Sequence, residues 1–157
     1  MGSEAASSLS AAECRDLRRA AGLMIPADDT FRIPGADDQL IQDDILRSLG
    51  RDLPQVRAAL AELNAIAGRS FGDLDDAAAE AAVQALHKKA SPASVVLGRV
   101  VLSCYYRDDR VLISLGVEPR PPFPKGHEVE QGDWSLLDKV KARAPFWRDP
   151  EQQTRDA

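Results

Sequence analysis

The side chains best suited to metal binding or acid–base chemistry are the two histidines of this chain. His127 stands in KGHEVE beside Glu128 and Glu130, an arrangement that could contact a metal ion. Zinc sites use ligands at a characteristic spacing, which this loop-like segment lacks, so the pattern favours a solvated surface. His87 is expected near the carboxyl end of a helix, where a basic side chain is simply favourable. Neither histidine predicts a catalytic site, and metal binding by His127 and the nearby acids is kept as an alternative.

Nucleophiles and phosphate-binding motifs give no stronger signal. Three serines have no histidine at a recognisable motif distance: Ser91, Ser94 and Ser103. GRSFGD lacks the residue order of a P-loop, and no strand precedes it. Four carboxylates lack EF-hand spacing and suit helix caps and turns better: Asp28, Asp29, Asp37 and Asp38. The sequence therefore predicts no catalytic residue, no metal site and no bound cofactor on this chain.

Composition argues against several functional classes. The 157 residues are 44% hydrophobic and 29% charged, which is typical of one soluble globular domain. The net charge of −5 argues against nucleic acid as the main partner. No segment approaches the roughly 20 apolar residues that span a bilayer, so membrane insertion is not expected. Two cysteines do not make a disulfide framework, and Cys104, in an apolar run, is expected to be a buried thiol, although a bridge to Cys14 is left open.

No signal peptide is expected from the first residues. Arg18-Arg19 resembles the start of a twin-arginine signal, but only a short apolar run follows before Pro26. The sequence as written predicts a cytoplasmic protein, or a periplasmic one if a twin-arginine signal has been removed.

The sequence pattern predicts that the elements positioning these residues are helices. Residues 1–9 are small and polar and are expected to be disordered. Ser10 and Glu13 have capping-box spacing, which predicts a first helix over about residues 11–24. Apolar stripes, caps and glycine stops predict further helices over about residues 39–49, 52–67, 71–89, 91–106 and 108–115. Residues 95–106 are apolar on nearly every side except Arg99, which predicts a central, buried helix. Residues 10–116 therefore predict a small all-α bundle.

The pattern changes in residues 117–157, which predict an extended arm. Six of the ten prolines lie between Pro119 and Pro150, and only DWSLLDKVKAR in this region has a helical pattern. Proline restricts a free segment, so less entropy is lost when the segment is fixed on a partner. Aromatic side chains are enriched at protein interfaces. Six aromatic residues at or just before the arm are the candidate partner-binding residues: Tyr105, Tyr106, Phe123, Trp134, Phe146 and Trp147.

Three segments of the chain resemble segments of one known family. Residues 9–38, with IPADD followed by PGADD, are similar to its opening helix and loop. GRVVLSCYYRDDRVLISLG, residues 98–116, resembles its later apolar helix, double aromatic and acidic turn. APFWRDP is similar to the PGFW ending of small subunits of related flavoprotein dehydrogenases. The family is the gluconate 2-dehydrogenase subunit 3 family, and the resemblance covers about residues 9–150.

The resemblance implies that this chain has a non-catalytic role. Members of this family are non-catalytic small subunits, and their partner is a large flavoprotein of the glucose-methanol-choline (GMC) oxidoreductase family. That partner holds the FAD and oxidises a sugar or another alcohol, while the small subunit supports its folding and, in many members, its export. We expect this chain to be such a subunit. The alternatives are a free-standing helical adaptor and an independent metal-binding protein that uses His127.

Overall fold

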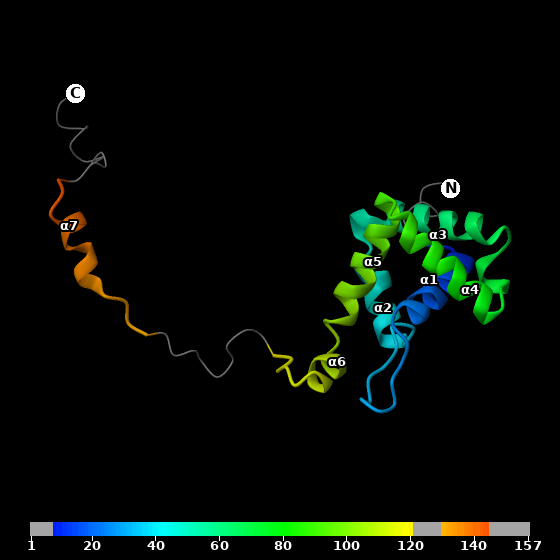
Figure 1. Ribbon diagram of the computed structural model, residues 1–157, viewed down its shortest axis with the longest axis horizontal. Coiled ribbons are helices and arrows are strands. Elements are labelled where there is room, and N and C mark those ends of the chain that lie inside the picture. Colours follow the sequence, from blue (N-terminus) through cyan, green and yellow to red (C-terminus); the bar gives the residue numbers. More distant parts are fainter. Residues whose placement is uncertain (1–7, 121–129, 145–157) are drawn as a thin grey trace, which may run out of the picture. The chain divides into compact units, whose positions relative to one another are not determined.

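The computed structural model describes residues 8–120 and 130–144, within two compact units, Met1–Arg120 and Pro121–Ala157. The described residues confirm the predicted all-α fold, since they form helices and no strand (Figure 1). The first unit contains α1 Ala11–Met24, α2 Gln39–Ser48, α3 Leu53–Ala67, α4 Asp76–Lys89, α5 Pro92–Tyr105 and α6 Asp109–Ser114, with short 3-10 turns at Gly50–Asp52 and Phe71–Asp73.

Helix α1 begins where the capping box predicts. The backbone N–H of Ser10 donates to Oε2 of Glu13 at 2.7 Å, and the N–H of Glu13 donates to Oγ of Ser10 at 3.3 Å. The hydrogen bond from the Ser10 backbone lowers the pKa of Glu13, so the carboxylate stays charged at the positive end of the helix. Arg57 of α3 also donates to Glu13, at 2.9 Å. The cap therefore joins two helices.

The prediction of one helix over residues 71–89 is wrong at its start. Phe71–Asp73 is a separate 3-10 turn, and α4 begins only after Asp75, whose side chain accepts from the N–H of Ala78 at 2.8 Å. Phe71 is fully buried, and its N–H donates to Oδ1 of Asn64 at 2.7 Å. Burial of this aromatic ring holds the segment against α1 and α3 before the Asp75 cap starts the helix.

The core lies mainly between α3 and the helices around it, since α3 packs against α1, α4 and α5. Ile41 and Ile45 of α2 are buried, whereas Leu40 and Leu46 of the predicted apolar stripe are exposed. The largest fully buried side chains come from α1, α2, α3, α5, α6 and the 3-10 turn: Phe71, Leu17, Ile41, Ile45, Leu60, Leu63, Val56, Val101 and Val111.

Helix α5 is not enclosed on all sides, which corrects the prediction of a central buried helix. Its inner face, with Leu97, Val100 and Val101, is buried against α2, α3 and α4. Its outer face leaves Val95 60% exposed and Leu102 44% exposed. The helix therefore carries more apolar surface than the bundle covers.

The second unit contains the helical turn that was predicted in the arm. A 3-10 turn, η4 Trp134–Leu137, continues into α7 Asp138–Lys141. The Asp133 side chain accepts from the N–H of Ser135 at 3.0 Å and caps the turn. Every described residue of this unit, 130–144, is exposed. Across residues 8–120 and 130–144, no helix has the length and apolar character needed to cross a bilayer.

Candidate partner-binding surface

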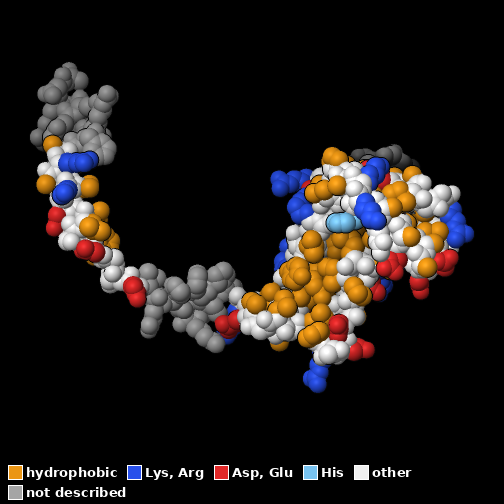
Figure 2. Space-filling view, in the orientation of Figure 1, with side chains coloured by type: hydrophobic (Ala, Val, Ile, Leu, Met, Phe, Trp, Pro, Cys, Tyr) orange, Lys and Arg blue, Asp and Glu red, His pale blue; other side chains and the backbone are white. Residues whose placement is uncertain are grey.

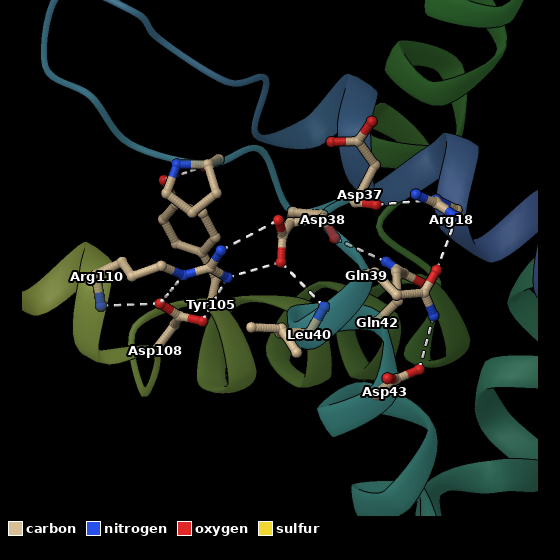
Figure 3. A network of polar contacts seen from close by, with 12 residues as sticks. Arg18, Asp37, Asp38, Gln39, Leu40, Gln42, Asp43, Tyr105, Asp108 and Arg110 are labelled. Atoms are coloured by element: carbon tan, nitrogen blue, oxygen red, sulfur yellow. Dashed lines mark hydrogen bonds and ion pairs between the residues drawn. The ribbon is translucent and has the colours of Figure 1, made fainter.

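An arginine joins two of the three segments that carry the family resemblance. Arg110, from RDDR at the start of α6, donates to Oδ1 of Asp38 at 2.6 Å and to Oδ1 of Asp108 at 3.0 Å. Asp38 is the last residue of PGADD and lies 72 positions earlier in the chain. Figure 3 shows the guanidinium between the two carboxylates. The motifs therefore meet in space as a structural brace.

The same two carboxylates start helices. Asp38 accepts from the N–H of Leu40 at 3.0 Å and caps α2, and Asp108 accepts from the N–H of Arg110 at 2.9 Å and caps α6. Hydrogen bonds from the Arg110 side chain hold the pKa of both Asp38 and Asp108 below the ordinary aspartate value. Groups held so firmly in their charged form suit bracing better than proton transfer.

Tyr105 belongs to the core and is removed from the candidate partner-binding residues. The residue is 2% exposed, and its hydroxyl donates to the carbonyl oxygen of Pro34 at 3.2 Å. Burial raises the pKa of the Tyr105 phenol, so it stays a protonated donor. Tyr106 is 53% exposed and lies edge-on to Tyr105, with ring centroids 5.2 Å apart. Only the second residue of the double aromatic can meet a partner.

The loop between α1 and α2 presents an aromatic residue that the sequence interpretation missed. Asp28 pairs with Ile33 in an isolated antiparallel bridge, and its carboxylate accepts from the backbone N–H groups of Thr30 and Phe31. Phe31, at the tip, is 67% exposed. The capping and turn roles predicted for Asp28 and Asp38 are confirmed. The exposure of Phe31 follows from the turn that Asp28 stabilises, and this turn could not be predicted from the sequence pattern alone.

An apolar groove lies between α4 and α5, beside Met24, the last residue of α1. It consists of two adjoining hollows with volumes of about 410 and 550 Å³, which share Met24, His87, Ser94 and Gly98. Leu86 and Leu97 form the buried floor, and Val95 and Leu102 lie on the open side. Figure 2 shows apolar side chains gathered in a continuous patch over this part of α5.

Small side chains explain why the groove exists. Helices α4 and α5 are joined by only two residues, Ala90 and Ser91, and both pack against α3. Ser94 and Gly98 lie four residues apart on one face of α5 and offer little to fill the space beside α4. A methyl group added to Gly98 would meet only the terminal carbon of Met24, at 3.9 Å. The hollow is therefore open at Gly98.

The charged side chains along the groove are all basic. Lys88 and Arg99 line it together with His87, and none of the described lining residues is acidic. Arg99 also forms an ion pair with Asp52 at 2.8 Å. The chain as a whole has a net charge of −5, so the groove differs in sign from the rest of the molecule.

The described part of the arm also exposes apolar side chains. Trp134 is 63% exposed, and its indole N–H donates to Gln131 at 3.3 Å. Leu136 and Val140 are 75% and 52% exposed. Four predicted residues lie outside the described residues: Phe123, His127, Phe146 and Trp147.

The paired arginines of α1 have structural roles. Arg18 donates to the carbonyl oxygen of Asp37 at 2.9 Å, and Arg19 donates to the carbonyl oxygen of Gly72 at 2.9 Å. The Arg19 guanidinium also lies over the Phe71 ring, 5.6 Å from its centroid. Arg18-Arg19 therefore belongs to a folded helix, and each arginine ties α1 to a neighbouring segment.

The cysteines and acidic groups show no assembled reactive site in the described ranges. Cys104 is buried, as predicted, and burial raises the pKa of its thiol. Cys14 is also a free thiol. Within residues 8–120 and 130–144, no three His, Cys, Asp or Glu side chains lie close enough together to hold a metal ion.

No family model, curated protein or solved structure matches this chain. The likeness to the gluconate 2-dehydrogenase subunit 3 family stays a prediction from the motif segments.

Proposed function

We propose that this chain is a non-catalytic small subunit that stabilises, and aids the maturation of, an FAD-dependent GMC-type dehydrogenase acting on a sugar or alcohol. The observation that supports the binding role is the apolar groove between α4 and α5, which is open among the described residues of the first unit. Contiguous apolar surface of this kind on a small protein marks an interaction site. The identity of the partner comes from the resemblance of residues 9–38 and 98–116 to the small-subunit family.

The contacts of the resembling segments support this proposal indirectly. Asp38, Tyr105 and Arg110 hold one end of the bundle together. In this proposal they set the shape of the subunit, and the partner supplies the flavin and all residues that touch the substrate. In this proposal, the compartment of the chain is that of its partner.

Affinity purification of the tagged full chain from its own cells tests the proposal. We expect a large flavoprotein to co-purify, with a flavin absorbance spectrum and dye-linked oxidation of sugars or alcohols. Deleting the small-chain gene should lower the amount of soluble, flavin-loaded large protein. A tagged chain that is pure, folded and free of any flavoprotein would contradict the proposal. A metal that travels stoichiometrically with the chain alone would favour the His127 alternative.

A further inference from the structure

We infer that the groove between α4 and α5 binds an amphipathic helix of the partner, with acidic residues beside its apolar face. The partner's identity rests on the proposed function, but the helical and acidic chemistry of the bound segment is argued from the groove alone.

The walls of the groove favour a helix over an extended strand. Both long sides are α-helices, whose backbone N–H and C=O groups are already paired within each helix. A strand laid here would find no sheet edge to pair with and would leave its own backbone groups unpaired. A helix satisfies its backbone internally and can place an apolar stripe in the groove.

The floor gives a place for close contact. Ser94 and Gly98 are small and stand on one face of α5, and Leu86 and Leu97 beneath them are buried. Packing distances between helices depend on the side chains at the contact, so small residues allow a closer approach. The apolar residues of the bound helix would fill the two hollows, whose volumes are about 410 and 550 Å³.

The rim selects the charge of the bound helix. Lys88 and Arg99 stand on the two walls, and the described lining residues include no acid. Opposite charges across an interface raise the association rate and disfavour wrong partners. Glu or Asp on both sides of the apolar stripe would meet Lys88 on one wall and Arg99, which also pairs with Asp52 at 2.8 Å, on the other. Charge complementarity therefore commits the site to an acidic amphipathic helix.

A pair of synthetic helical peptides without tryptophan tests this inference on the full chain. Both carry leucines at helical spacing, and they differ only in flanking Glu or Lys residues. We expect calorimetry to show saturable binding of the Glu peptide. The Lys peptide should bind with an affinity lower by roughly tenfold or more. Gly98→Phe fills the hollow, and the affinity of this variant for the Glu peptide should be lower by roughly tenfold or more. Ala61→Phe, at an exposed site on α3, is the matched control and should bind normally.

Each contrary result has a defined meaning. No binding of the Glu peptide, equal binding of both peptides, or normal binding by a folded Gly98→Phe variant would overturn the inference. Both tryptophans lie in the arm, so a red shift of tryptophan emission on adding peptide would show that the arm is the occupant. A dimer that Gly98→Phe converts to monomer would make a second copy the occupant. If the peptides behave as expected and no flavoprotein co-purifies, the groove inference stands and the proposed function fails.

Discussion

The two ends of α5 differ in what their side chains do. At its carboxyl end, Tyr105 is buried and the following turn is fixed by Arg110 to Asp38. Towards its amino end, the outer face carries Val95 and Gly98 beside an open apolar groove. Tyr105, Asp108 and Arg110 of the resembling segment 98–116 stabilise the fold. The groove shares Gly98 with that segment, but Ser94 and Val95 lie outside the resembling segments.

The largest expected effect separates the two faces of α5. Val100 is 5% exposed, so Val100→Asp would bury an unpaired carboxylate and cost several kcal/mol, about 3 or more. We expect loss of the cooperative thermal transition and of most helical circular dichroism signal. Val95→Asp, five residues earlier and 60% exposed, is the matched control and should change the melting temperature little. Equal effects of the two substitutions would contradict the assignment of a buried and an open face.

The Arg110 brace, which follows the carboxyl end of α5, is expected to contribute a smaller part of the free energy of unfolding. Arg110→Ala removes the guanidinium between Asp38 and Asp108 but leaves both helix caps in place. Because Arg110 is 41% exposed, solvent screens the ion pairs, and we expect a loss of about 1 kcal/mol in urea unfolding. Arg47→Ala is the control, since Arg47 is 70% exposed and pairs only at 3.5 Å, and its effect should be within about 0.5 kcal/mol. A negligible effect of Arg110→Ala would show that the caps alone hold this end.

The brace should also depend on pH. The folded pKa values of Asp38 and Asp108 lie below the ordinary value of about 3.9, so their stabilisation is present above that pH and is lost as pH falls through the folded values. The advantage of the wild type over Arg110→Ala should therefore be complete at neutral pH and shrink below about pH 4. Urea unfolding of both proteins at several pH values measures this. A difference that is unchanged in acid would assign the effect to packing of the arginine stem.

The sequence could predict the features that depend on local residue spacing, but not those that depend on tertiary contacts. Caps depend on local spacing, so the helix starts at Ser10 and Asp38 could be predicted, and so could the all-α class. The break between Phe71 and Asp75 could not, because it depends on a ring that is buried by distant helices. The burial of Tyr105 and the exposure of Tyr106 also depend on tertiary contacts, since neighbouring residues of the same type look alike in sequence. The groove escaped prediction because Ser94 and Gly98 matter only for the space they leave.

The double aromatic gives a finer test of the same comparison. Tyr105→Phe keeps the ring and removes the donor to the Pro34 carbonyl, so we expect a loss of about 0.5–1.5 kcal/mol in unfolding free energy. Tyr106→Phe is the matched control, and because its ring is 53% exposed the change should stay within about 0.5 kcal/mol. Similar values for the two variants would mean that the Pro34 contact adds nothing to stability.

The smallest effect on the bundle itself is expected from removing the arm. Among residues 8–120 and 130–144, the buried core residues run from Leu17 to Val111. A chain ending at Gly116 keeps all of these and should keep its helical signal and melting temperature. Its effect should appear only with the partner, because the arm carries the exposed Trp134 and the predicted anchors Phe123, Phe146 and Trp147.

The flavoprotein is co-expressed with the full chain or with the chain ending at Gly116, and the amount of soluble, flavin-loaded large subunit is measured. We expect a smaller amount with the shortened chain. In the full chain, Trp134→Ala should weaken the complex by about 2 kcal/mol if this side chain is an anchor. Lys139→Ala, on the neighbouring exposed turn, should leave the complex unchanged. If the shortened chain still yields a fully loaded, active partner, the groove side of the bundle is sufficient for binding and the arm is not an interface. If it fails while Gly98→Phe in the full chain binds normally, binding belongs to the arm.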